Sequence, residues 1–393
     1  MTAAERRASI SLASIFALRM LGLFLVLPVF ALEAARYPGG DDPARVGLAM
    51  GIYGLTQALL QIPLGMASDR WGRKRVILLG LALFAAGSMV AATARSLDFL
   101  ILGRALQGAG AISAAITAFI ADVTRDEVRT KAMAMVGISI ALMFALSLVF
   151  SPILAAHIGL GGLFWLTATL ALAGMAVVAW VVPPEPQEYV DAGRGGLREV
   201  LAHSGLLRLD LGVFVLHAVQ LAMWMAVPAL LVQAGLAQPE HWKVYLTALV
   251  LSFLVMGGVL FRLERRGYLR AVFLFAIGLI LLVQVGFWFS ATHTPSLPLL
   301  AVGLFLFFMG FNTLEASQPS LASRLAPAHA RGAALGVYNT LQSVGFFAGG
   351  AAGGWISSHH GPQGLFMVCG GLSLLWLVVA WNMQAPAKAV TRH

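Results

Sequence analysis

The chain alternates long apolar runs with short polar interruptions. A helix that spans a membrane needs about 20 mostly apolar residues, and twelve runs of this kind are present. They cover residues 9–32, 46–67, 75–94, 97–122, 132–156, 160–183, 208–233, 242–261, 270–291, 296–322, 332–357 and 362–384. The pattern predicts an all-α membrane protein with twelve transmembrane helices.

The longest polar stretch, residues 184–207, divides these runs into six and six. We therefore expect an N-terminal six-helix bundle over residues 1–183, a cytoplasmic linker over 184–207 that turns helical at Leu197, and a C-terminal bundle with a short tail over 208–393. The glycine-containing loops around Gly72 and Gly267 echo one another, as do the segments at Gly161 and Gln363. Their offsets of 195 and 202 residues favour a parallel repeat and two pseudo-symmetric bundles.

Composition and charge agree with a membrane protein. Charged residues make up 11% of the chain and the mean hydropathy is +0.85, whereas soluble domains carry roughly 25% charged residues. Twelve spans leave no room for a separate soluble catalytic domain. The single cysteine, Cys369, excludes a disulfide framework and a cysteine-based zinc site.

The net charge of +9 reflects membrane topology. With the N-terminus in the cytoplasm, twenty Lys and Arg residues fall on the cytoplasmic face and four on the opposite face, namely Arg36, Arg45, Arg95 and Lys243. This bias predicts cytoplasmic N- and C-termini. No basic block of the nucleic-acid-binding kind is present, so we expect no nucleic-acid partner. The first apolar run is too long for a signal peptide and is expected to stay in the mature protein.

The loop after the second run, residues 65–75, combines glycines with charges. Gly65 and Gly72 allow close backbone approach in a short turn. Asp69 can cap a helix N-terminus, and Arg73 can pair with a carboxylate such as Asp122 at the end of the fourth run. The start of the eleventh run, 332–336, is a candidate partner for Asp69 from the other half. Arg70, Lys74 and Arg75 have the simpler interpretation of fixing topology.

Two arginines fall inside apolar runs, where a cation costs roughly 2.5–3.5 kcal/mol on insertion scales. Arg19 lies in the first run and Arg104, with Gln107 nearby, in the fourth. Both are expected to face a wet cavity or a partner. Arg104 either couples protons or binds substrate, or it is a structural residue bonded to helix-one carbonyls. Arg19 either lines the cavity or braces its helix.

Glu315 is the most deeply placed carboxylate. It lies well inside the tenth run and shares a helix face with Asn312. A carboxyl group there can bind and release a proton in each cycle, or it can be structural near Pro319. Asp210 is interpreted as an N-cap or interfacial residue. His217 is a packing residue or a proton relay, and Gln57 and Gln61 either line a cavity or bond between helices.

The residues 65–75, read as GMASDRWGRKR, resemble motif A of the major facilitator superfamily, and 103–110, GRALQGAG, resemble motif B of its drug:proton antiporters. The segments 18–22, 103–108, 130–139 and 336–340 are most similar to the YajR-like branch. The chain departs from that resemblance in two ways. Members of that branch may carry a C-terminal soluble domain, whereas none is expected after the short tail of this sequence. Where antiporter motif C ends in Gly-Pro, it has Phe150, Ser151 and Pro152.

The resemblance implies a transporter in a bacterial inner membrane, with motif A as a conformational latch formed by Gly65, Asp69, Arg70, Gly72, Arg73 and Asp122. It also makes Arg104 a coupling or substrate-site residue. The whole set predicted for proton coupling or the substrate cavity is Arg19, Arg104, Gln107, Gln57, Gln61, His217, Asn312 and Glu315.

The function predicted from these features is proton-coupled efflux of small amphipathic compounds by alternating access. No P-loop or nucleophile–base constellation is present, so we expect no enzyme activity, no cofactor and no metal. The expected partners are a small-molecule substrate, protons and the lipid bilayer, and the expected state is a monomer. Two alternatives stay open: an exporter or uniporter of a specific sugar or amino acid, and a non-transporting membrane receptor or assembly factor.

Overall fold

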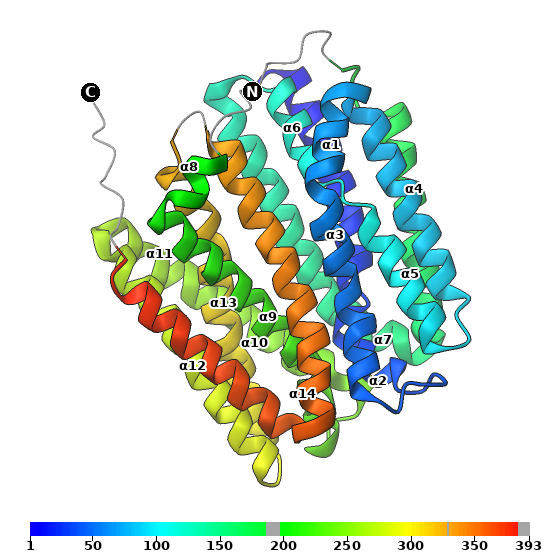
Figure 1. The fold of residues 1–393 in the computed structure, drawn as a ribbon, viewed down its shortest axis with the longest axis vertical. Helices are drawn as coiled ribbons and strands as arrows, with labels where there is room; N and C mark the ends of the chain where they lie inside the picture. The colour runs from blue at the N-terminus through cyan, green and yellow to red at the C-terminus, as the bar shows by residue number, and fades with distance from the viewer. Residues whose placement is uncertain (186–196, 328–329, 384–393) are drawn as a thin grey trace.

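The computed structural model describes residues 1–185, 197–327 and 330–383, and these are helical with short connections. The N-terminal part contains α1 (Ala3–Phe24), α2 (Leu27–Ala34), α3 (Pro43–Trp71), α4 (Arg73–Ala92), α5 (Leu97–Ala109), α6 (Ser113–Val123) and α7 (Asp126–Trp180) (Figure 1). The C-terminal part contains α8 (Leu197–Ala202), α9 (Ser204–Gln233), η1 (Gln238–Glu240), α10 (His241–Val255), η2 (Met256–Leu260), α11 (Phe261–Leu263), η3 (Glu264–Tyr268), α12 (Leu269–Thr292), α13 (Leu297–Leu325) and α14 (Arg331–Trp381).

The predicted twelve crossings are confirmed. Within the described residues, ten helical segments are long and apolar enough to cross a membrane, and two of these, Lys131–Trp180 and Arg331–Trp381, have 50 and 51 residues. At 1.5 Å per residue, each of the two would measure about 75 Å, more than twice the ~30 Å hydrocarbon core. The backbone reverses inside each of them, so each contributes two crossings.

The two reversals are made by equivalent glycines. Gly159 has φ 63° and ψ −177°, and Gly361 has φ 67° and ψ −178°, a region that essentially only glycine occupies. Gly72 and Gly267 also adopt positive φ, at 98° and 102°. These pairs are 202 and 195 residues apart, so the backbone repeats at the offsets found in the sequence.

Two spans that were expected to be continuous are broken. The first divides into α1 and α2 just before Pro28, which has no N–H to bond to the preceding turn. The fourth divides into α5 and α6 at residues 110–112. Its glycines lie against neighbouring backbone: a Cβ on Gly108 would be 2.1 Å from the Tyr53 carbonyl oxygen, and one on Gly110 would be 2.3 Å from that of Gly80.

The two halves of the chain meet along α3 and the first part of α14. A Cβ on Gly47 would lie 2.3 Å from the Gly350 carbonyl oxygen, and one on Gly54 would lie 2.5 Å from that of Ser343. A Cβ on Gly354 would lie 2.5 Å from the Pro43 carbonyl oxygen. Glycines of the segment 349–354 therefore pack directly against the backbone of α3. All these contacts lie in the half of α3 near Pro43, which the distribution of Lys and Arg assigns to the periplasmic side.

Polar contacts close the same side. Gln238 Nε2 donates to Glu33 Oε1 at 3.0 Å, and Ser358 Oγ donates to Asp42 Oδ1 at 3.1 Å. Each of these bonds joins the N-terminal part of the chain to the C-terminal part. They hold the loops and helix ends of the periplasmic side together.

At the opposite end, the halves are apart. Gly332 and Gly336, in the first turns of α14, have no neighbouring atom within 4 Å of an added Cβ. Figure 1 shows α3 and the orange first part of α14 converging downward, away from the end that carries the N-terminus. The structure is therefore closed on the periplasmic side and faces the cytoplasm.

Candidate functional site

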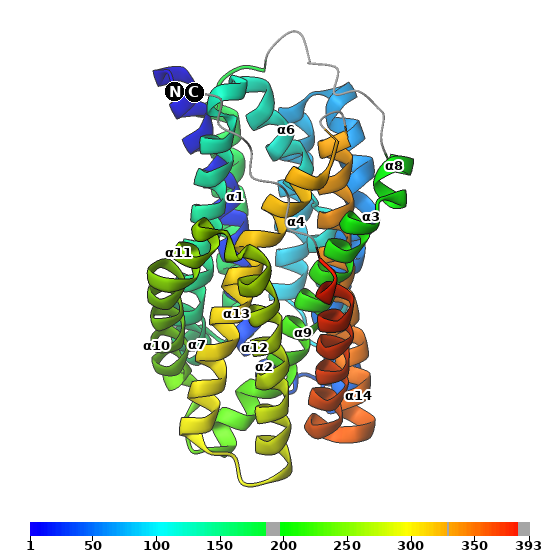
Figure 2. The ribbon, with the colours of Figure 1, turned by 90° about the vertical axis from the view of Figure 1, so that its left-hand side faces the viewer.

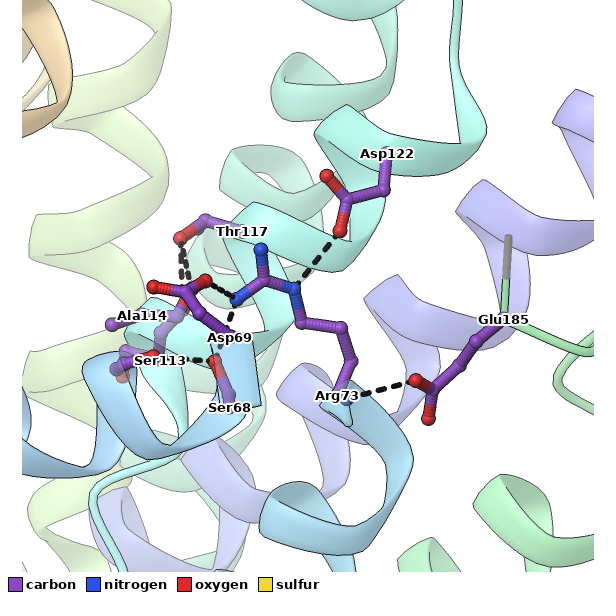
Figure 3. A network of polar contacts seen from close by, with 9 residues as sticks. Ser68, Asp69, Arg73, Ser113, Ala114, Thr117, Asp122 and Glu185 are labelled. Atoms are coloured by element: carbon purple, nitrogen blue, oxygen red, sulfur yellow. Dashed lines mark hydrogen bonds and ion pairs between the residues drawn. The ribbon is translucent and has the colours of Figure 1, made fainter. Parts of the chain in front are cut away.

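The motif around α3 and α4 forms one polar cluster, drawn in Figure 3. Arg73 is 5% exposed and its Nε donates to Asp122 Oδ2 at 2.9 Å. Its Nη1 donates to Ser68 Oγ at 2.7 Å and pairs with Asp69. The predicted pair of Arg73 with Asp122 is present, and the same guanidinium also bonds the end of α3. Gly65 allows this packing, since a Cβ there would lie 3.3 Å from the Ala114 Cβ of α6.

Glu185 is a member of this cluster that the sequence analysis missed. Its carboxylate accepts from the Arg73 and Lys74 backbone N–H groups at 3.1 and 2.6 Å. It thereby satisfies the start of α4, whose N-cap residue Gly72 has no side chain. Asp69 was expected to cap a helix, but it lies inside α3 and bonds Arg73 instead. Glu185 follows the sixth crossing in an irregular segment, so no helical spacing pointed to it.

Asp69 and the start of α14 do not make a latch in this conformation. The Asp69 side chain is 57% exposed, while Gly332 and Gly336 face open space. The two halves are separated at this end of the cytoplasm-facing structure, so the predicted contact between Asp69 and the start of α14 is not made here. Arg70 is exposed beside Asp69, as expected for a residue that sets topology.

Replacing Arg73 by alanine is expected to lower the free energy of unfolding by about 3–5 kcal/mol, because it leaves the buried Asp122 carboxylate unpaired. Thermal unfolding in detergent, followed by a thiol- or tryptophan-based signal, measures the loss. Arg70→Ala is the matched control, with an expected effect of about 0.5 kcal/mol or less. Equal melting temperatures for the two variants would contradict a structural role for this cluster.

A second cluster brings α9, α13 and α14, all labelled in Figure 2, together around Glu315. Glu315 Oε2 lies 3.3 Å from His217 Nε2, and Glu315 Oε1 lies 3.4 Å from Gln342 Nε2. Gln342 Nε2 is also 2.7 Å from His217 Nε2. His217 Nδ1 donates to the Val213 carbonyl at 2.9 Å, which leaves Nε2 directed at the carboxylate and the amide.

This cluster lies beside the contact between the two halves. The Glu315 side chain is 39% exposed although it lies in the interior of α13. Its partners are on α9 and α14, the helices that contact α2 and α3. Gln342 is followed by Ser343, which Gln57 of α3 bonds, so one partner of the carboxylate adjoins the other half.

Three polar residues singled out in the sequence lie apart from the Glu315 cluster. Asn312 donates to Ser252 Oγ of α10 at 3.2 Å, away from the partners of Glu315. Asp210 caps nothing: α9 begins at Ser204 with His203 as its N-cap, so Asp210 is buried inside the helix. Gln61 is buried, and its Oε1 atom has no partner.

A third cluster surrounds the two intramembrane arginines, each 1% exposed. Arg19 Nη2 donates to Tyr53 Oη at 2.7 Å and to Gln57 Oε1 at 3.0 Å. Arg104 Nη1 donates to Gln107 Oε1 at 2.8 Å, and its Nη2 to the Met50 carbonyl at 3.4 Å. Among the described residues, Arg104 thus bonds within α5 and to α3, and not to the helix-one carbonyls of the structural alternative.

Gln57 connects this third cluster to the other half. Its Nε2 donates to Ser343 Oγ of α14 at 3.0 Å while its Oε1 accepts from Arg19. Gln107 donates to Ser88 Oγ at 2.8 Å and so ties Arg104 to α4. The arginine cluster thus reaches the contact surface between the halves through one glutamine.

Comparisons with known proteins identify the family. The sequence model of the Major Facilitator Superfamily matches this chain over residues 12–350 and 263–392. The chain is 43% identical over 390 residues to the inner membrane transport protein YajR of Escherichia coli, covering 98% of this chain and 85% of that protein. It is 25% identical to multidrug resistance protein 1 of Bacillus subtilis, covering 94% and 95% of the two chains.

Solved structures show the same fold. A mutant of the nucleoside transporter NupG superposes with a TM-score of 0.77 at 13% identity, covering 96% of this chain and all of that chain. An inward-facing, occupied bacterial homologue of the human lysosomal transporter Spinster gives 0.72 at 16% identity, with 97% and 96% covered. The chain therefore belongs to the Major Facilitator Superfamily, as a secondary transporter of the inner membrane and not an enzyme.

Proposed function

We propose that this transporter exports small amphipathic compounds in exchange for protons. The observation that carries the proposal is the contact of Glu315 with His217 and Gln342, beside the contact between the halves. A carboxylate inside a membrane span is costly unless it has a partner or a function. Here it has one partner that can itself hold a proton, and it remains partly exposed.

The geometry supports proton exchange at this pair. Since His217 Nδ1 donates to a backbone carbonyl, Nε2 either accepts from the Gln342 amide or carries a proton toward Glu315. One proton therefore has two acceptor atoms, 3.3 Å apart. The charges of Glu315 and His217 change when the proton binds or leaves. Their attraction for the substrate and for the polar groups of the other half changes with these charges.

Alternating access would let the Glu315–His217 pair exchange its proton with one side of the membrane at a time. The structure is open toward the cytoplasm, where a substrate enters and a proton leaves. Separation of the α3–α14 contact and closure at motif A would expose the same site to the periplasm. An inward proton supplies about 2.3 kcal/mol per 100 mV of membrane potential, enough for a substrate gradient above tenfold. The similarity to a named multidrug resistance protein supports export as the direction.

Proteoliposomes test the proposal. Purified protein is reconstituted with a pH-sensitive dye in an acidic lumen, and cationic dyes, antibiotics, sugars and amino acids are added outside. We expect amphipathic compounds to raise the lumenal pH, with no change in protein-free vesicles. Substrate flux without a pH change would instead establish a uniporter. If well-folded protein gave neither substrate flux nor a pH change with any compound, a receptor would be favoured.

A further inference from the structure

Arg19 and Arg104 form a buried positive centre without a counter-charge. Their hydrogen-bond partners are Tyr53, Gln57, Ser113, Gln107 and the Met50 carbonyl, all neutral groups. Among the residues that the structure describes, neither guanidinium contacts a carboxylate. The Nε atoms of both arginines have no hydrogen-bond partner at all.

Tyr53 brings the two cations together. Its hydroxyl accepts from Arg19 at 2.7 Å, and its ring centroid lies 4.9 Å from the Arg104 guanidinium carbon. Two cations that share one tyrosine inside a membrane repel each other and have lost most of their hydration. A buried charge is retained when another charge compensates it, so this centre favours an anion.

The break in the fourth span adds a third positive element at the same place. α6 starts at Ser113, its N-cap Ile112 makes no side-chain hydrogen bond, and its first turn contains no acidic residue. Arg19 Nη1 lies 3.4 Å from Ser113 Oγ. The uncapped N–H groups and positive helix end of α6 therefore lie beside a guanidinium that is 1% exposed.

We propose that Arg19 and the N-terminus of α6 bind the anionic head of the transported compound, a carboxylate or sulfonate, and that Arg104 strengthens this site through its charge. The inference rests on the proposed transport function and names its substrate class: amphipathic anions. In the cytoplasm-facing structure, Gln57 Oε1 accepts a hydrogen bond from the Arg19 guanidinium. An incoming anion replaces this neutral acceptor and frees Gln57.

The replacement links binding to the movement of the halves. Gln57 bonds Arg19 through its oxygen and Ser343 of α14 through its nitrogen. When an anion takes the place of the amide oxygen, Gln57 loses one of the two bonds that hold it between the halves. Binding of the anion thus weakens one contact of the state closed on the periplasmic side.

The test uses three probes with one apolar body: naphthalenesulfonate, naphthalenesulfonamide and naphthyltrimethylammonium, which carry a negative charge, no charge and a positive charge. Binding to the purified protein is followed by probe fluorescence, and uptake is measured in acid-loaded proteoliposomes. We expect the sulfonate to bind at least about tenfold more tightly than the sulfonamide, equivalent to ~1.4 kcal/mol, and the cation to bind least.

Variants assign this preference to the site. Arg19→Gln is expected to reduce the preference for the sulfonate to about threefold or less, and Arg19→Lys, which keeps the charge, to retain more of it. Arg7→Gln, a neutralised exposed cytoplasmic arginine, is the matched control and keeps the full preference. Gel filtration verifies that each variant is folded.

Several results would overturn the inference. One is equal or tighter binding of the neutral or cationic probe by folded protein, and another is an unchanged preference in Arg19→Gln. Displacement of the sulfonate by millimolar chloride or phosphate would mark an inorganic-anion site instead. These outcomes are independent of the proposed function, which fails only if no compound moves protons: proton-coupled transport of cations would retain the function and reject the anion site.

Discussion

Glu315→Gln is expected to abolish proton-coupled transport, with a loss of at least about 100-fold in the substrate-dependent change of lumenal pH, corresponding to ~2.7 kcal/mol or more. The glutamine keeps the size of the side chain and its bond to Gln342, but it cannot take up a proton. His217 then has no carboxylate partner. The carrier should still bind substrate and exchange it down a gradient, because the cluster remains polar and filled.

The measurement separates coupling from folding. Counterflow of labelled substrate, which needs no proton, should remain within about threefold of the unmodified protein, as expected when only the driving step is removed. Glu240→Gln is the matched control: its carboxylate is about half exposed at the periplasmic surface and pairs with Lys243. Full proton coupling in Glu315→Gln would assign the proton to another group.

Periodicity and charge were sufficient to predict the twelve crossings and their two sets of six, because a bilayer imposes length and polarity on every span. The same pattern could not locate the breaks at residues 25–26 and 110–112. These depend on Pro28 and on which backbone packs against Gly108 and Gly110, and packing partners lie far away in the sequence. Residues 186–196 and 384–393, parts of the expected linker and tail, lie outside the described residues, and α8 begins at Leu197 as expected.

Candidate site residues could be selected by residue type, but their grouping could not be predicted. An ionisable residue in an apolar run is informative by itself, which is why Arg19, Arg104 and Glu315 are candidates. Their partners could not be found in this way, since a shared helix face does not determine which neighbouring helix each side chain meets. Asn312 bonds α10 while Glu315 meets α9 and α14. Gln342 of α14, which comes from a distant part of the chain, contacts both His217 and Glu315.

The contact between the halves also explains the cost of changing conformation. Motif A carries its ion pairs within the N-terminal part, so they persist when the cytoplasmic side opens. The periplasmic closure combines side-chain hydrogen bonds between the halves with backbone contacts between α3 and α14, and in the backbone contacts no side chain can rotate away. Added volume there should therefore change the balance between the two states more than the stability of either half.

Gly350→Val is expected to shift the population away from the cytoplasm-facing state. A Cβ on Gly350 would lie 2.6 Å from the Gly51 nitrogen, 2.7 Å from the Gly47 carbonyl oxygen and 2.7 Å from the Gly51 Cα. All three are backbone atoms, so α3 and α14 must separate on the periplasmic side. Overpacking of this kind costs typically about 1–3 kcal/mol, which changes the ratio of the two states by about 5- to 150-fold. A complete reversal from 1:99 to 99:1 would need about 5.5 kcal/mol, so valine should increase the population of the periplasm-facing state, and alanine should increase it less.

Spin labels at two exposed cytoplasmic positions, Arg75 of the N-terminal part and Arg331 of the C-terminal part, report the change. Cys369 is 3% exposed and should not be labelled. The distance between the labels should shorten in Gly350→Val, and transport should slow while the protein remains folded. Gly286→Val is the matched control, because a Cβ on Gly286 in α12 meets nothing within 4 Å. An unchanged label distance in Gly350→Val would show that the glycine contact does not determine which side is closed, and the alternating-access assignment of α3 and α14 would have to be abandoned.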